Sequence, residues 1–245
     1  DPGASALVCR AEPGIPATVW FKPDFSVGQE SGGMRFKTFF YGGMELLGKK
    51  DRTFDGAIIN AALPNTAIVP LCQHPGAPAL PLVARGDVVK ENMAIGQSPD
   101  SEVVHSPIPG IVQDIRDIRL PDGSLSPAVV IELAGGFDRT GRQVQHHDWE
   151  QLGPDELLGL IREMGVSGLG NTALPTHLKL KAARGGPGTP KASHLIINAM
   201  ESEPYQTADF RTLEEKAAQI LEGIRIIQHI LGGVPTILAL SSEYR

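Results

Sequence analysis

The chain has 245 residues and a formal charge of −6, from 22 basic and 28 acidic residues. This balance argues against a nucleic-acid-binding protein, which usually presents a basic face. No apolar run approaches the roughly 18 residues that a membrane-spanning helix needs. Cys9 and Cys72 are too few for a disulfide framework or, by themselves, for a zinc or iron–sulfur site. The chain begins with Asp, so we expect a processed or shortened product.

Composition divides the chain into three segments. Residues 1–33 are rich in Gly, Pro, Ser and Ala without periodicity, and we expect a loose arm. Residues 34–150 are predicted to form a β-rich unit and residues 151–245 an α/β unit. An aromatic cluster in the second segment fits a core or an interface better than a ligand site. It consists of Phe36, Phe39, Phe40 and Tyr41.

Residues 54–135 carry short apolar or alternating runs, namely GAIINAAL, TAIVPL, LPLVARGDVV, PGIVQDIRDI and PAVVIEL. Turn dipeptides punctuate this region: Gly86-Asp87, Pro109-Gly110 and Asp122-Gly123. Many short strands without an intervening helix predict a small barrel or sandwich.

The C-terminal segment has the pattern of strand, helix and strand. SHLIINA and PTILALS are continuous apolar runs that predict buried parallel strands over residues 194–199 and 235–240. An amphipathic helix is predicted between them over residues 212–231, with Thr212 and Glu215 as its capping box. Together these elements predict a right-handed parallel βαβ unit.

A glycine-rich stretch from Gly168 to Lys179, GLGNTALPTHLK, follows a predicted helix, PDELLGLIREMG, which Asp155 can cap. Glycines let backbone N–H groups approach a phosphate closely, and a lysine neutralises its charge. An ordinary turn-rich connector is the alternative, and this stretch alone leaves both open.

Asn198 lies at the carboxyl end of the strand predicted over residues 194–199, and Glu201 and Glu203 follow that strand. In open α/β sheets, ligands bind at the carboxyl ends of the strands. The amide can hydrogen-bond a flavin or a ribose, and the carboxylates can accept hydrogen bonds from a ribose or a carboxamide. A solvated acidic loop is the alternative interpretation of the same residues.

Several motifs occur in a characteristic order: LCQHPGAPALPLVARGDVVKENMAIG, VHSPIPGIVQDI, GLGNTALPTHLKL, LIINAMESEPYQTADFR and EGIRIIQHIL. This order resembles the C subunit of the Rnf ion-translocating electron-transport complex, from about residue 32 to residue 240. The A subunit of the sodium-translocating NADH–quinone reductase and the cobalamin reductase of propanediol use are similar at greater distance.

The glycine-rich and acidic motifs also resemble the flavin-binding 51-kilodalton subunit of respiratory complex I. The resemblance implies a barrel-sandwich hybrid unit of the biotinyl/lipoyl type, followed by part of a Rossmann-like domain for FMN and NADH. It implies contacts with the FMN phosphate from Gly168, Gly170, Asn171 and Lys179. It implies contacts with the isoalloxazine and nicotinamide rings from Asn198, Glu201 and Glu203.

The chain departs from the family pattern in the glycine-rich loop, where Asn171 replaces a Gly, Thr172 an Ala or Gly, and Leu174 a Phe. Side chains occupy space that the phosphate needs, so we expect this chain not to hold flavin tightly. Residues 181–190 are predicted to be a flexible insertion. The family's remaining nucleotide-binding half, its β-grasp module and its cysteine clusters for 4Fe–4S centres have no counterpart here. The chain is therefore either a fragment or a shortened family member.

Two further sites are not expected. Carrier proteins of the barrel-sandwich fold display a modified lysine at a hairpin tip, but Lys90 follows the turn at Gly86-Asp87 too closely, so we interpret the barrel as a scaffold. The 7 histidines show no metal-ligand spacing, and the adjacent His146 and His147 do not share a helix face.

Two functions remain in view. The first is a peripheral subunit on the cytoplasmic side of the cell membrane, in an Rnf-type complex that passes electrons between NADH and iron–sulfur centres through FMN. Its partners would be the other subunits, and we expect this chain alone to be inactive. The alternative is a non-catalytic structural or docking subunit that keeps the fold and has lost cofactor binding. A visible spectrum separates the two, because bound flavin absorbs there.

Overall fold

The computed structural model describes residues 17–21 (backbone only), 47–74, 77–98, 103–135, 147–168, 174–201 and 203–240. Cys9 and the predicted aromatic cluster lie outside these residues. The chain divides into two compact units, Asp1–Asn60 with Ser193–Gln228 and Val234–Arg245, and Ala61–Ala192 with His229–Gly233. The segment boundaries predicted at residues 33 and 150 stay predictions.

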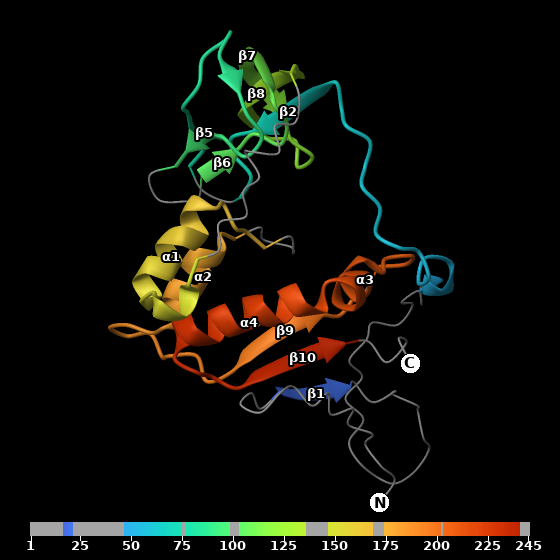
Figure 1. Cartoon of the computed structure of the whole chain (residues 1–245), viewed down its shortest axis with the longest axis vertical. Helices are drawn as coiled ribbons and strands as arrows, with labels where there is room; N and C mark the ends of the chain where they lie inside the picture. The colour runs from blue at the N-terminus through green and yellow to red at the C-terminus, as the bar shows by residue number, and fades with distance from the viewer. Residues whose placement is uncertain are drawn as a thin grey trace, which may run out of the picture. The chain divides into compact units, whose positions relative to one another are not determined.

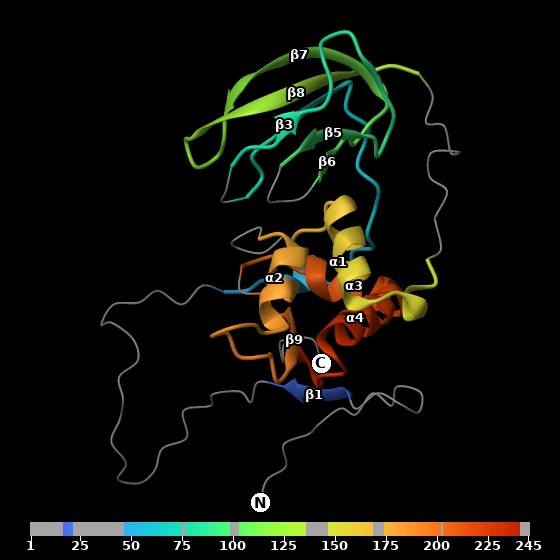
Figure 2. The ribbon, with the colours of Figure 1, turned by 90° about the vertical axis from the view of Figure 1, so that its left-hand side faces the viewer.

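The unit built mainly from Ala61–Ala192 contains two antiparallel sheets, which Figure 2 shows as two layers. One sheet has the order β2-β8-β7-β4 and the other β3-β5-β6. The strands are β2 (Thr66–Pro70), β3 (Leu80–Pro81), β4 (Val88–Val89), β5 (Ala94–Gln97), β6 (Val103–His105), β7 (Gly110–Arg119) and β8 (Leu125–Leu133). This arrangement confirms the predicted all-β unit.

Alternating apolar side chains of these strands fill the space between the sheets. Ile95, Ile131 and Val129 are fully buried there, so the core lies between the layers. β7 and β8 form a long hairpin whose turn contains Gly123, with a φ of 88°. Ser124 N–H closes this turn by donating to Asp122 Oδ1 at 2.9 Å.

One predicted strand is absent. Residues 56–64 have no regular secondary structure, although GAIINAAL was predicted as a strand. The run lacks a clean alternation of apolar and polar residues, and the N–H of Ile58 donates to Glu215 Oε1 at 3.0 Å instead of to a neighbouring strand. The backbone N–H of Ile58 is thus satisfied by the Glu215 side chain and not by a neighbouring strand.

In the same unit, the two antiparallel sheets, which form the barrel, are followed by the 3-10 turn η3 (Trp149–Gln151) and then by two helices. Helix α1 spans Pro154–Glu163 and α2 spans Thr176–Ala183. The N-cap of α1 is Gly153, whose N–H donates to Glu156 Oε2 at 2.7 Å, so the predicted cap at Asp155 is wrong. Asp155 lies in the first turn and forms an ion pair with Arg184.

The end of α1 packs on the barrel. Arg162 Nη2 donates to the carbonyl oxygen of Ser98 at 3.3 Å. Gly165 ends the helix with a φ of 63°, and a Cβ there would lie 2.5 Å from the carbonyl oxygen of Val103. A glycine is therefore required at this joint for both its conformation and its size.

The segment after α2 is more regular than the sequence suggested. Residues 181–183 complete α2, and a tight turn follows in which Gly186 and Thr189 exchange two backbone hydrogen bonds of 3.1 and 2.9 Å. Gly185 and Gly188 adopt positive φ there. The predicted flexible insertion over residues 181–190 is thus the end of a helix and a closed turn.

The other unit contains a parallel sheet in the order β1-β10-β9. Its strands are β1 (Ala17–Phe21), β9 (Leu195–Ala199) and β10 (Thr236–Leu240). The parallel pairing of β9 and β10 confirms the predicted βαβ unit. Figure 1 shows α4 lying along these two strands. β1 lies within the segment predicted as a loose arm, so five residues of that arm join the sheet.

The crossover consists of two helices rather than the single one predicted. α3 spans Ala208–Glu215 and α4 spans Ala217–Leu231, with a bend at Lys216. The predicted capping box is wrong because Thr212 lies inside α3, where its hydroxyl donates to the carbonyl oxygen of Ala208 at 2.6 Å. Glu215 is engaged by Arg211 and Ile58.

Among the described residues, no helix is both long and apolar enough to cross a membrane. The same residues contain no group of three His, Cys, Asp or Glu side chains placed to hold a metal ion.

Candidate functional site

The glycine-rich motif forms a loop whose two ends are tied together. Ser167 and Pro175 form an antiparallel bridge, and Thr176 N–H donates to the carbonyl oxygen of Val166 at 3.0 Å. Pro175 is fully buried and leads directly into α2. Gly170 and Asn171, both predicted as cofactor contacts, lie outside the described residues.

Lys179 turns back from α2 toward the start of this loop. Its Nζ atom lies 3.4 Å from the position that a Cβ would take at Gly168. A Cβ at Gly168 would lie at van der Waals distance from the ammonium group, so this cation lies directly beside the glycine backbone. The structure thus brings together two of the residues predicted to hold a phosphate, a bare backbone and a cation.

His177 occupies the first turn of α2 and is buried, with an exposed fraction of 7%. Within the described part of the chain its Nδ1 atom has no hydrogen-bond partner. Burial lowers the pKa of His177, and the positive charges of Arg162, His74 and Lys181 lower it further. The imidazole is therefore neutral at pH 7 and sits in a basic environment near the glycine-rich loop.

The acidic motif begins at the carboxyl end of β9. Asn198 is exposed, and its Oδ1 accepts a hydrogen bond from the N–H of Met200 at 3.1 Å, which turns the chain sharply out of the strand. Glu203 is exposed as well. These two side chains lie at the strand edge, where the sequence predicted ligand contacts.

Glu201 differs from its neighbours because it is buried, with an exposed fraction of 7%. Its Oε1 atom accepts a hydrogen bond from the N–H of Asp209 at 2.8 Å, in the first turn of α3. A carboxylate at a helix N-terminus satisfies an unpaired donor and complements the helix dipole. The interpretation of this motif as a solvated loop is therefore wrong for Glu201.

The carboxylates of this loop influence one another. Partial burial raises the pKa of Asp209, and the negative charges of Glu201 and Glu203 raise it further. Asp209 consequently keeps its proton to a higher pH than an isolated aspartate would. Two carboxyl groups of the loop, Glu201 and Glu203, thus act electrostatically on a third, Asp209, in the first turn of α3.

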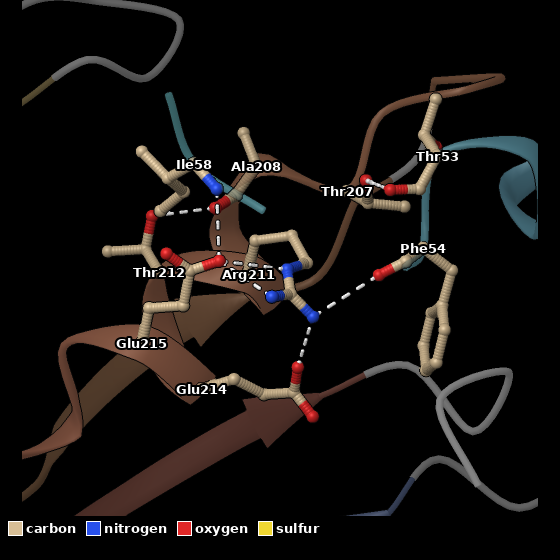
Figure 3. A network of polar contacts seen from close by, with 9 residues as sticks. All are labelled: Thr53, Phe54, Ile58, Thr207, Ala208, Arg211, Thr212, Glu214 and Glu215. Atoms are coloured by element: carbon tan, nitrogen blue, oxygen red, sulfur yellow. Dashed lines mark hydrogen bonds and ion pairs between the residues drawn. The ribbon is translucent and has the colours of Figure 1, made fainter. Parts of the chain in front are cut away.

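The residues from Asn198 to Thr207 are called the acidic loop below. A polar network holds this loop and α3 against the segment that precedes the two antiparallel sheets (Figure 3). Arg211 donates to Glu214 at 2.5 Å, to Glu215 at 2.6 Å and to the carbonyl oxygen of Phe54 at 3.4 Å. The aromatic rings of Phe54 and Phe210 stack with centroids 4.6 Å apart. No sequence pattern indicated the contact between Arg211 and Phe54, because these partners are 157 residues apart in the chain.

The predicted site residues therefore fall into two groups. Gly168 and Lys179 lie together in one compact unit, and Asn198, Glu201 and Glu203 lie on one loop of the other. Each group is built from the elements of its own unit. The first offers a cation beside glycine backbone, which suits a phosphate, and the second offers an amide and carboxylates, which suit polar ring edges and ribose hydroxyls.

Two family models match the chain. Residues 38–136 match the RnfC barrel-sandwich hybrid domain, and residues 161–245 match the Nuo51 FMN-binding domain. The first match covers the two antiparallel sheets and the second covers α2, the parallel strands β9 and β10, and both predicted motifs. Together they confirm the predicted fold class.

Curated proteins similar to this chain carry related names. The chain is 34% identical over 194 residues to the C subunit of the proton-translocating ferredoxin:NAD(+) oxidoreductase complex of Clostridium ljungdahlii, covering 78% of this chain and 42% of that protein. It is 34% identical over 208 residues to the C subunit of the ion-translocating oxidoreductase complex of Vibrio cholerae, covering 83% and 26%. It is 38% identical over 196 residues to the C subunit of the ion-translocating oxidoreductase complex of Pseudomonas aeruginosa, covering 78% of this chain and 25% of that protein. The chain thus spans less than half the length of these relatives.

Proposed function

Because this chain belongs to the C-subunit family of Rnf-type ion-translocating oxidoreductases, we propose that it serves electron transport in such a complex, with FMN bound at the glycine-rich loop. FMN accepts a hydride and passes electrons on singly, which suits a subunit between NADH and iron–sulfur centres. The barrel serves as a scaffold in this proposal, and the α/β part carries the nucleotide chemistry.

The observation that carries the proposal is the position of the Lys179 ammonium group beside Gly168. A lysine ammonium group beside glycine backbone can neutralise a phosphate while backbone amides donate to it. The bridge between Ser167 and Pro175 fixes the base of that loop. Gly168 and Lys179 therefore support a site for the phosphate end of FMN, and Asn171 and Thr172 are the residues expected to weaken it.

We assign the polar edges of the flavin and of NADH to the acidic loop. Asn198 and Glu203 are exposed near the end of β9, where the amide NH2 of Asn198 can donate hydrogen bonds and the carboxylate of Glu203 can accept them. Glu201 contributes indirectly, since its carboxylate holds α3. In this proposal the electron acceptors are 4Fe–4S centres, which the family resemblance implies for a C-terminal part.

The proposal extends to partners and location. Relatives are named as subunits of multi-subunit complexes, so we propose that this chain works with other subunits of a membrane electron-transport complex. It would be a peripheral subunit on the cytoplasmic side. Co-purification of a tagged chain with a membrane fraction, and its release by high salt, would support this placement.

Titration with FMN, followed by quenching of flavin fluorescence, tests the binding step. We expect saturable quenching that weakens about tenfold in Lys179→Met, because a charge-assisted contact with the phosphate is lost. Lys181→Met is the matched control, since Lys181 is an exposed lysine of the same helix. Riboflavin lacks the phosphate, so its binding should be equal in both variants.

Absence of saturable FMN binding would favour the alternative, a structural or docking subunit without cofactor. The feature that favours this alternative is the pair Asn171 and Thr172 in place of small residues. Equal FMN affinity in Lys179→Met and wild type would also contradict the proposed site.

A further inference from the structure

A short segment before the barrel follows the acidic loop closely. This segment, Gly48 to Ile58, contains the 3-10 turn η1 (Lys50–Arg52) and is called the brace below. Its contacts with the acidic loop and α3 are Tyr205 N–H to Gly48 O at 2.7 Å, Thr53 Oγ1 to Tyr205 O at 2.8 Å, Thr207 Oγ1 to Thr53 O at 3.2 Å and Ile58 N–H to Glu215 Oε1 at 3.0 Å.

Lys50, in η1, adds a further contact between the brace and the acidic loop. It is buried, with an exposed fraction of 8%, which is unusual for a lysine. Its Nζ atom donates to the carbonyl oxygen of Glu201 at 2.5 Å. The ammonium group thus binds the backbone of the acidic loop at the residue whose side chain enters the first turn of α3.

Two hydrogen bonds hold the acidic loop at Glu201, one through its backbone and one through its side chain. The backbone of Glu201 is fixed by Lys50, and its carboxylate is fixed by the N–H of Asp209 at 2.8 Å. The loop between Asn198 and Thr207 is consequently anchored at its ends and in its middle. Such anchoring reduces the conformational freedom that a ligand would otherwise have to remove.

We propose that Lys50 is a positioning residue for the nucleotide site, which acts through the backbone of Glu201 to present Asn198 and Glu203 to the ligand. The inference rests on the proposed function for the identity of that ligand. Lys50 is not a ligand contact itself, because its buried ammonium group is directed to the Glu201 carbonyl oxygen. The brace is therefore part of the binding machinery although Lys50 lies 151 residues before Glu201 in the sequence.

The test compares Lys50→Met with Arg52→Met in the full chain. Both variants remove one positive charge from the same 3-10 turn, but Arg52 is exposed. Hydrogen exchange is measured without ligand, and NADH affinity is measured at a temperature where both variants are folded. We expect faster exchange over residues 199–209 and about tenfold weaker NADH binding in Lys50→Met alone, since a buried charge-assisted hydrogen bond is lost. Exchange in β7 and β8 should stay unchanged.

A second variant, Thr53→Val, keeps the inference testable if Lys50→Met does not fold. Thr53→Val removes the hydroxyl that donates to Tyr205 and should speed exchange over residues 203–207 more mildly. Exchange in Lys50→Met or Thr53→Val equal to that of wild type would overturn the inference, as would unchanged NADH affinity in Lys50→Met. If wild type binds neither FMN nor NADH, the proposed function fails, while the exchange measurement still decides whether the brace positions the loop.

Discussion

Glu201 and Glu203 belong to one motif, and their surroundings give them different roles. Glu201 is buried and caps α3, whereas Glu203 is exposed beside the end of β9. A residue that holds the loop affects ligand binding through stability, and a residue that contacts the ligand, as proposed for Glu203, affects it directly. The two carboxylates therefore provide a clean separation of structural and binding effects.

We predict that Glu201→Gln lowers the free energy of unfolding by about 1 kcal/mol, because it replaces a carboxylate by a neutral acceptor at a helix N-terminus. Glu203→Gln should leave stability unchanged and weaken NADH binding. Denaturant unfolding and a binding titration of both variants check this. Equal loss of stability in the two variants would contradict the assignment.

Asn171 and Thr172 stand where the family pattern has small residues. If larger side chains there take up space that a phosphate needs, smaller residues should restore it. We predict that the double variant Asn171→Gly, Thr172→Ala binds FMN more tightly than wild type, as measured by fluorescence quenching. Riboflavin affinity serves as the control and should not change. Weaker FMN binding in the double variant would show that these side chains contribute contacts.

His177 gives stability a dependence on pH. Its folded-state pKa lies below the ordinary value of 6.5, because of burial first and then the charges of Arg162, His74 and Lys181. As pH falls below about 6.5 the unfolded chain binds a proton before the folded chain does, so the free energy of unfolding decreases until the folded-state pKa is reached. Well above pH 6.5 His177 is neutral in both the folded and the unfolded chain, so it no longer makes the free energy of unfolding depend on pH.

We predict that His177→Phe loses less stability than wild type between pH 7.5 and pH 5, measured by denaturant unfolding at each pH. His194→Gln, a change at an exposed histidine of the other unit, should keep the wild-type dependence. Parallel curves for all three proteins would be inconsistent with a neutral, buried His177.

At the scale of the secondary-structure elements, the glycine that begins β7 allows the two strands of the long hairpin to approach. A Cβ at Gly110 would overlap the carbonyl oxygen of Glu132 and lie 2.8 Å from Cγ2 of Ile131. By contrast, Gly159 lies within α1, and a Cβ added there would meet no atom within 4 Å outside the neighbouring backbone of its own helix. The same substitution therefore has opposite consequences in a strand and in a helix.

We predict that Gly110→Ala lowers the free energy of unfolding by about 1–3 kcal/mol, as expected for overpacking. Gly159→Ala should raise it by roughly 0.5–1 kcal/mol, because alanine is the better helix former. Thermal or denaturant unfolding of the two variants measures the difference. Similar stability of both would mean that the backbone at Gly110 moves freely away from β8.

Elements with strong periodicity were predictable from the sequence. β7 carries apolar residues among polar ones, β8 contains the apolar run AVVI, and β9 and β10 are mostly apolar runs. All four were therefore predicted as strands, and the parallel pairing was correct for β9 and β10. Helix α2 was missed because THLKLKAA lacks a clear apolar face and follows a glycine-rich loop. α3 was placed too late because Thr212 and Glu215 imitate a capping box while the helix already began at Ala208.

At the scale of the whole molecule, the positions of the glycine-rich and acidic motifs along the chain were predictable. The residues that hold the acidic motif in place were not. The family resemblance located the glycine-rich loop and the acidic loop. Lys50 and Arg211 carry no local signal, since their roles depend on tertiary contacts that span 151 and 157 residues of the chain. Burial of Glu201 follows from those contacts and was therefore not predictable from its own motif.

The most direct test of the central claim is hydrogen exchange of the full chain with and without saturating FMN. We predict slower exchange over residues 166–180, where the loop and the start of α2 would hold the phosphate, and over residues 198–203 at the end of β9. Lys179→Met should lose the first of these effects. Protection confined to the barrel strands β2 to β8, or no protection anywhere, would contradict the placement of FMN in this chain.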